Sequence, residues 1–127
     1  MNDNKLETKT VDSYKEHTHS IIIIKKGDKY LNYFDERWGT YLFPNIKGND
    51  IEKIKKMYNT DNVEFLFDKI HNKYSVPNKE LRTYHHYFYK VNADVDGEYF
   101  TLDELLNKDG VRESNGDIIE FIKESLI

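Results

Sequence analysis

Four lysines near the middle of the chain carry ammonium groups of the kind that hold phosphate oxygens. Lys47 follows Pro44 in a predicted loop, and Lys53, Lys55 and Lys56 lie in the short helix predicted after it. Lysine serves as a point-charge partner for phosphate. Charged residues on a short amphipathic helix also form a face that is exposed to water. From the residues alone, both interpretations stay open.

Arg37, Trp38 and Phe43 bring a guanidinium group and two aromatic rings close together in the sequence. Planar groups of these kinds stack on nucleobases, and a guanidinium group also stabilises anions. Aromatic side chains more often serve packing, so burial in the core is the competing interpretation of Trp38 and Phe43. The sequence predicts either one wall of a ligand site or part of the core here.

A strand predicted over residues 81–91 offers two different faces to a ligand. Because side chains alternate along a strand, Tyr87 and Tyr89 share one face, and His86 and Phe88 share the other. One of these faces should look into the concave side of the sheet. The sequence does not say which, and we take Tyr87 as the candidate ligand contact.

The five histidines raise the question of a metal site. His17 and His19 share a strand face, whereas His85 and His86 are adjacent and point to opposite faces. No His-Glu or cysteine spacing completes a recognised metal site. A hairpin turn around Gly97 explains the acidic residues of the next loop better than a cation site does: Asp94, Asp96 and Glu98. We predict no metal ligand.

The composition excludes several classes of protein. The chain of 127 residues has no cysteine, which excludes a disulfide framework, a cysteine-based zinc site and a thiol nucleophile, and favours a reducing cytoplasm. Its longest apolar run, Ile21 to Ile24, is far shorter than the roughly 20 residues that span a membrane. No signal peptide is recognised, and a net charge of −4 argues against a nucleic-acid partner. Ten Tyr, seven Phe and one Trp supply the apolar area of a folded domain.

Strands must position most of these residues. β-branched and aromatic residues predict strands at 14–24, 29–34, 41–43, 63–67 and 81–91. Gly27 and Asp28 form a hairpin turn between the first two, and Pro44 ends the third because it cannot donate to a ladder. Residues 70–79 fit either a further strand or an irregular loop broken by Pro77.

Three helices complete the predicted α+β domain, which spans residues 13–127 after a polar tail or marginal first strand at 1–12. The first begins at Asn49, with Glu52 completing a variant of the capping box. The second opens with the capping box of Thr101 and Glu104. The third begins between 114 and 117, and its spacing predicts four buried residues: Ile118, Ile119, Ile122 and Leu126.

Three stretches of the sequence resemble the Nudix hydrolase family. The hairpin with Ser20 to Ile24 and Tyr30-Leu31 is similar to the family's opening hairpin. Arg37 to Asn45 is similar to the tryptophan, glycine and Phe-Pro-Gly-Gly element, and Gly97 to Leu105 with the terminal helix is similar to the family's closing elements. The resemblance covers the chain from about Thr18 to the C-terminus. It implies a mixed β-sheet sandwiched between helices, and it puts Lys47 where the family's loop approaches phosphates.

The catalytic helix is where the sequence departs from the family's pattern. In the family, glutamates on one helix face hold magnesium and activate water on a diphosphate. If Ile54 takes the family's apolar position, then Lys53, Lys56 and Met57 stand where the three glutamates belong, and Glu52 stands where the arginine belongs. Ammonium groups repel a divalent cation. We therefore expect no ordinary Nudix magnesium site.

The function we expect is that of a catalytically degenerate Nudix-like domain, which binds a nucleotide or nucleotide-derived ligand without magnesium-dependent hydrolysis, alone or with a protein partner. One alternative is a divergent phosphohydrolase of nucleoside diphosphate derivatives with relocated acids such as Glu64, Glu80 or Glu98, which alone would need magnesium. The other is a protein-interaction domain with a vestigial pocket. We predict no catalytic residue and no cofactor, and six ligand-binding residues: Arg37, Trp38, Phe43, Lys47, Tyr87 and Glu98.

Overall fold

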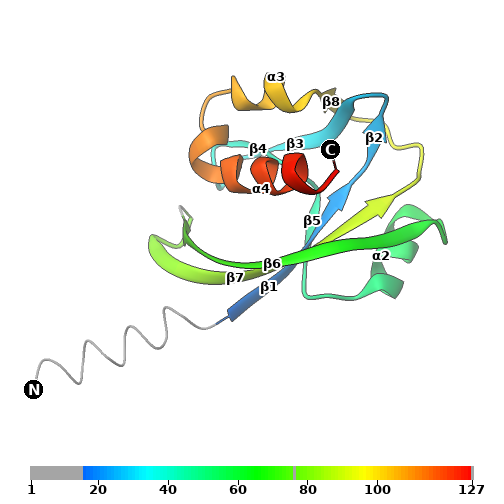
Figure 1. Cartoon of the computed structure of the whole chain (residues 1–127), viewed down its shortest axis with the longest axis horizontal. Helices are drawn as coiled ribbons and strands as arrows, with labels where there is room; N and C mark the ends of the chain where they lie inside the picture. Colours follow the sequence, from blue (N-terminus) through cyan, green and yellow to red (C-terminus); the bar gives the residue numbers. More distant parts are fainter. Residues whose placement is uncertain (1–15, 76, 127) are drawn as a thin grey trace, which may run out of the picture.

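The computed structural model of the chain describes residues 16–75 and 77–126 and contains two β-sheets with helices around them (Figure 1). The first sheet, in the order β5-β1-β7-β6, consists of β1 (Glu16–Ile23), β5 (Asn45–Lys47), β6 (Val63–Ser75) and β7 (Glu80–Val91). The second sheet joins β2 (Lys25–Lys26), β3 (Lys29–Asp35), β4 (Thr40–Leu42) and β8 (Glu98–Phe100). The described helices are α2 (Ile51–Tyr58), α3 (Leu102–Leu106) and α4 (Val111–Leu126). The predicted tail at 1–12 lies outside the described residues.

Strand β1 lies inside the first sheet and makes that sheet mixed. It pairs in parallel with β7, which places His19 opposite His86, and antiparallel with β5, which places His19 opposite Lys47. Strands β6 and β7 form a long antiparallel hairpin. Neighbouring side chains on β1 point to opposite faces of the sheet, so both faces of the sheet need a covering element.

Two hydrophobic clusters cover the two faces of this sheet. In the first, here called the α4 cluster, Ile21 and Ile23 pack with Phe88 and with three isoleucines of α4, Ile118, Ile119 and Ile122. In the second, here called the α2 cluster, Ile22 and Ile24 pack on the other face with Tyr89 and with Ile54 of α2. The unbroken apolar run from Ile21 to Ile24, at the end of β1 and just after it, is therefore explained by burial on both faces. This arrangement is the predicted mixed sheet between helices.

The observed ends of the helices agree only in part with those predicted from the sequence. The capping box of α3 is confirmed, because Glu104 N–H donates to Oγ1 of Thr101, and Thr101 N–H donates to Oε1 of Glu104. The predicted cap of α2 is wrong by one residue, since the side chain of Asp50 accepts from Lys53 N–H. The start predicted for α4 is also late. The helix begins at Val111, which is fully buried, while the side chain of Leu126 lies outside the described residues.

The observed strands differ from the predicted ones more than the helices do. Residues 70–79, left open by the sequence, mostly extend β6, which continues to Ser75 before the turn that contains Pro77. The short strand β5 was not predicted, because three residues between Pro44 and Gly48 carry no pattern of their own. None of the helices in the described part of the chain is long and apolar enough to cross a membrane.

Replacing the cap of α3 tests how much this short helix depends on it. Thr101→Ala removes the oxygen that accepts from Glu104 N–H, so the free energy of unfolding should fall by about 1 kcal/mol. Urea unfolding measures the change. Ser125→Ala, at an exposed position of α4, serves as the control and should change stability by less than about 0.5 kcal/mol. Equal stability of the two variants would show that the capping box contributes nothing.

Candidate functional site

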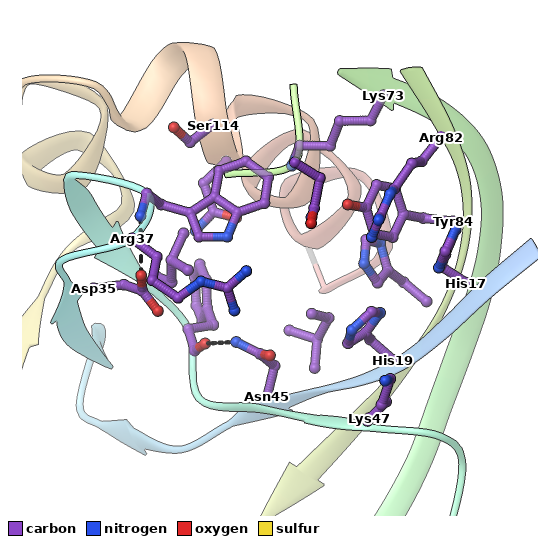
Figure 2. A pocket seen from close by; sticks show the side chains of 17 residues that line it. His17, His19, Asp35, Arg37, Asn45, Lys47, Lys73, Arg82, Tyr84 and Ser114 are labelled. Carbon is purple, nitrogen blue, oxygen red and sulfur yellow. Dashed lines mark hydrogen bonds between the residues drawn. The ribbon is translucent and has the colours of Figure 1, made fainter. Parts of the chain in front are cut away.

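A cavity of about 420 Å³ opens between the first sheet, the turn after β3 and the start of α4 (Figure 2). Asp35 and Arg37 lie on one side of it, and His17, Arg82 and Tyr84 lie on the other. The walls therefore come from both sheets and from α4. The cavity continues the face of the first sheet on which the α4 cluster is buried.

Four of the six predicted ligand-binding residues line this cavity: Arg37, Trp38, Phe43 and Lys47. Phe43 is also part of the core, at 2% exposure, so packing is its main role there. Trp38 is half-buried and lies outside both hydrophobic clusters, with Nζ of Lys73 5.6 Å from its ring centroid. Of the two interpretations that the sequence left open, the core fits Phe43 and the cavity wall fits Trp38.

The other two predicted residues do not line the cavity. Tyr87 points to the opposite face of the first sheet, where it packs beside the α2 cluster and stacks on His85 at 4.2 Å between ring centroids. Glu98 lies on β8, where its carboxylate accepts a hydrogen bond from the Tyr41 hydroxyl at 3.2 Å. It is His86, on the alternate face of β7, that faces the cavity.

The turn that carries Arg37 and Trp38 is tied together by Asp35. Oδ1 of Asp35 accepts from Trp38 N–H at 3.0 Å, and its carbonyl oxygen accepts from Gly39 N–H at 2.8 Å. Gly39 has a φ of 69°, a conformation that favours glycine. The sequence Asp-Glu-Arg-Trp-Gly thus folds into a tight turn that holds Arg37 and Trp38 over the sheet.

Lys47 is positioned by the pairing of β5 with β1. Oγ of Ser20 donates to the Gly48 carbonyl oxygen at 2.7 Å, and Ile22 N–H donates to the Pro44 carbonyl oxygen at 2.8 Å. Lys47 therefore lies directly across from His19 at the edge of the sheet. The three lysines of α2 do not line the cavity, and Lys55 instead forms an ion pair with Glu52 at 3.4 Å.

Positive charge predominates around the cavity. Arg37, Lys47, Lys73 and Arg82 line it, and Asp35 is the one carboxylate among the described lining residues. Arg82 pairs with Glu80 at 2.6 Å and Lys73 with Asp117 at 3.1 Å. Arg37 and Lys47 form no ion pair within the described part of the chain and are exposed to solvent. Their charge is available to an anion.

The sequence did not reveal a second polar group of residues beside the cavity. Nδ1 of His71 lies 3.1 Å from a carboxylate oxygen of Asp117, and Nε2 of His71 lies 2.8 Å from Nδ1 of His86. These residues are far apart in sequence, so only the register of β6 on β7 could have revealed them. Nδ1 of His19, opposite His86, is buried without a hydrogen-bond partner within the described residues.

Burial and neighbouring charges shift the pKa values of these groups. Burial, together with the charges of His71, Lys73 and His19, lowers the pKa of His86 to about 3. The pKa of His19 is lowered by burial and then by His17, Lys47 and Arg82, which are all basic. Burial raises the pKa of Asp117, but hydrogen bonds from His71 and Lys73 and their charges outweigh it and hold that pKa well below its usual range. The imidazoles of His19 and His86 are thus neutral at pH 7, and Asp117 is ionised.

No group of three or more histidine or acidic side chains that could hold a metal ion occurs within residues 16–75 and 77–126. Asp35 is the one carboxylate among the described lining residues, whereas four of those residues have cationic side chains: Arg37, Lys47, Lys73 and Arg82. Such a lining suits an anion.

Comparisons with known proteins identify the fold. No protein-family model and no curated protein sequence matches the chain. Among solved structures, the Nudix domain of Shewanella oneidensis NrtR, determined with ADP-ribose, superposes with a TM-score of 0.56 over 95% of this chain and 99% of that one, at 11% identity. The mutator MutT protein of Bacillus halodurans gives a TM-score of 0.55 over 82% and 80% at 18% identity. The Ap4A hydrolase of C. elegans gives 0.53 over 87% and 95% at 11% identity. The chain has the fold of the Nudix hydrolases, as the resemblance implied.

The low pKa of His86 makes stability dependent on pH. The unfolded chain binds a proton at His86 below about pH 6.5, whereas the folded chain does so only near pH 3, so stability is lost as the pH falls through this window. Between pH 7 and pH 5 the free energy of unfolding should fall by about 2 kcal/mol from this group. The lowered pKa of Asp117 also stabilises the folded state, but this contribution to the free energy of unfolding is lost only below about pH 3.8, the usual pKa of the carboxyl group. The two effects therefore fall in separate pH ranges.

Urea unfolding at pH 7 and pH 5 measures this loss. His86→Gln cannot bind the proton in either state, so the variant should lose much less stability than the wild type on acidification. Equal losses in the two proteins would remove His86 as the cause.

Proposed function

We propose that the chain binds a nucleotide or nucleotide-derived ligand in this cavity and does not hydrolyse it by the magnesium-dependent Nudix mechanism. The observation that carries the proposal is the positive charge of Arg37 and Lys47, which come from two elements of one cavity and form no ion pair within residues 16–75 and 77–126. Two cations held apart by a rigid sheet and a tight turn suit an extended anion such as a phosphate or diphosphate.

The aromatic lining supports a ligand that also carries a planar group. Trp38 is half-buried at the cavity wall, and Tyr84 is buried in the opposite wall, stacked on His86 with ring centroids 5.2 Å apart. Rings at such positions stack on nucleobases. The Nudix domain of NrtR, which shares this fold, was determined with ADP-ribose, and ADP-ribose is therefore a natural first probe.

The proposal excludes ordinary Nudix hydrolysis because of the residues that α2 carries. The helix presents Lys53, Lys55 and Lys56, and its one glutamate, Glu52, forms an ion pair with Lys55. Magnesium needs oxygen ligands and keeps its charge close to the substrate phosphates. A helix with three ammonium groups opposes that cation instead.

A thermal-shift panel tests the proposal. Nucleoside mono- and diphosphates, dinucleotides, cyclic nucleotides and ADP-ribose are added with magnesium or with EDTA. A ligand at a hundredfold excess over its Kd stabilises the folded state by about 2.7 kcal/mol, which is a shift of several degrees in Tm. We expect stabilisation that does not depend on magnesium. Magnesium-dependent stabilisation with release of phosphate would favour the divergent hydrolase, and no response to any member would favour a protein-interaction domain.

Reversing the charge of Lys47 tests the site itself. Lys47→Glu puts a carboxylate where the proposal needs a cation, so the Kd of the best ligand in the panel should rise by about a hundredfold. The melting temperature should hardly change, because Lys47 is exposed and unpaired within the described residues. Lys53→Glu, which makes the same charge change on α2 outside the cavity, is the matched control and should keep the wild-type affinity. Unaltered affinity in Lys47→Glu would remove Lys47 from the site.

A further inference from the structure

A chain of hydrogen bonds, here called the relay, runs from Asp117 on α4 through His71 on β6 to His86 on β7. The two links are 3.1 Å between Oδ2 of Asp117 and Nδ1 of His71, and 2.8 Å between Nε2 of His71 and Nδ1 of His86. Asp117 and His71 do not line the cavity, but His86 does. The Nε2 atom of His86 forms no hydrogen bond within the described part of the chain. The relay therefore ends at a free ring nitrogen beside the cavity.

The carboxylate of Asp117 decides where the protons of the relay lie. An ionised carboxylate only accepts, so Nδ1 of His71 must carry the proton of the first link. A neutral imidazole has one N–H, which leaves Nε2 of His71 as an acceptor for Nδ1–H of His86. The remaining nitrogen of His86, Nε2, then presents a lone pair. In this state His86 is an acceptor and disfavours an anion beside it.

One added proton reverses the direction of the second link. An imidazolium at His71 donates from both nitrogens, Nδ1–H to Asp117 and Nε2–H to His86. His86 then accepts at Nδ1 and carries its own proton at Nε2, where it becomes a donor toward the cavity. The positive charge stays on His71, next to the carboxylate of Asp117. The relay gains one proton, and none is required from the ligand.

A second proton on the relay is opposed by its surroundings. Burial and the neighbouring basic groups lower the pKa of His86 to about 3. The titratable or charged groups that face the relay come from every element around it: Asp117 on α4, Lys69 and Lys73 on β6, Arg82 and Tyr84 on β7, His17 and His19 on β1, and Lys47 on β5. All of them except Asp117 and Tyr84 are basic. An anion in the cavity offsets this repulsion and so favours the first proton.

We propose that His86 is an anion-binding residue of this cavity, and that a dianionic phosphate group draws one proton into the relay when it binds. This inference rests on the proposed function, because it concerns the phosphate end of the same ligand. It assigns Asp117 and His71 as positioning residues, which set the proton on His86 without touching the ligand. Binding of a phosphate group then strengthens as the pH falls.

Sulfate is the probe that tests the coupling, since it keeps two negative charges between pH 8 and pH 6 and adds no titration of its own. Nitrogen NMR spectra of the histidine rings are recorded with and without sulfate at constant ionic strength. In the free protein at pH 8 we expect Nδ1–H tautomers of His71 and His86. Sulfate should convert His71 to the doubly protonated form and move the proton of His86 to Nε2. A comparison with AMP shows whether a phosphate carried by a nucleoside binds more tightly than a free dianion.

Variants separate the relay from simple electrostatics. In the wild type the affinity for sulfate should rise on acidification, toward the limit of about tenfold per pH unit that one proton sets. His71→Gln keeps a side chain that can bond to both neighbours but cannot take the proton, so its affinity should change much less with pH. His85→Gln is the matched control, because His85 pairs with Asp68 at 2.7 Å on the other face of β7. It should behave as the wild type does.

The outcomes are distinguishable. One outcome would overturn the coupling but not the binding site. In it, sulfate binds to His71→Gln with the same pH dependence as to the wild type, and sulfate does not change the NMR signals of the ring nitrogens of His71 and His86 in the wild type. An Nε2–H tautomer of His86 in the free protein at pH 8 would also overturn it. Absence of sulfate and AMP binding at every pH would overturn both the coupling and the proposed anion-binding function. The NMR spectra of the wild-type protein test the proton coupling even if a variant does not fold.

Discussion

The parallel pairing of β1 with β7 is the constraint on which the rest of the structure depends. Its register places Ile21 opposite Phe88 and His19 opposite His86. Side chains alternate between the faces of a sheet, so one register assigns every residue of both strands to a face. A slip by one residue would bring Ile22 to the α4 cluster and remove His19 from the cavity. Packing of the core and construction of the cavity are thus set by the same pairing.

The face of the first sheet that packs against α4 changes from apolar to polar along its length. At one end it is apolar, where Ile21, Ile23 and Phe88 pack against the helix. Toward the start of β1 and the hairpin of β6 and β7 it becomes polar. There Lys47, His19 and His86 lie directly across from one another on three adjacent strands. The chain as a whole has a net charge of −4, yet this row carries basic groups. The buried core at one end fixes the position of the basic row at the other.

The sequence predicts those features of the fold and the site that depend on residues close together in the chain, and it does not predict those that depend on the packing of distant elements. The capping box of Thr101, the turn at Gly27 and the break at Pro44 depend on neighbouring residues, and the sequence predicted them. Arg37, Trp38 and Lys47, which line one cavity, were also candidate ligand-binding residues: the first two were chosen for their side-chain types, and Lys47 for its place in the Nudix resemblance. Tyr87 was chosen over His86 without a basis in the sequence, since alternation gives two faces and does not say which one lines a cavity. Only the position of α4, a helix that follows β7 by twenty residues, decides between them.

The histidine relay was beyond sequence reasoning for a further physical reason, which is a β-bulge in β6. Phe65 pairs with Tyr89, but Phe67 pairs with Phe88, so the register shifts between them. Before the shift, odd-numbered residues of β6 share the face of Tyr89 and α2. After it, they share the face of Phe88 and α4, where Phe67 stacks on Phe88 at 4.4 Å between ring centroids.

Without the bulge, regular alternation would carry His71 and Lys73 to the α2 face of the sheet, away from Asp117. One extra residue in β6 therefore delivers both side chains to the carboxylate on α4 and completes the relay beside the cavity. A bulge leaves no clear signal in a sequence, because the segment around Leu66 is apolar on both sides of the shift. The polar network beside the cavity thus depends on an irregularity that only the folded sheet reveals.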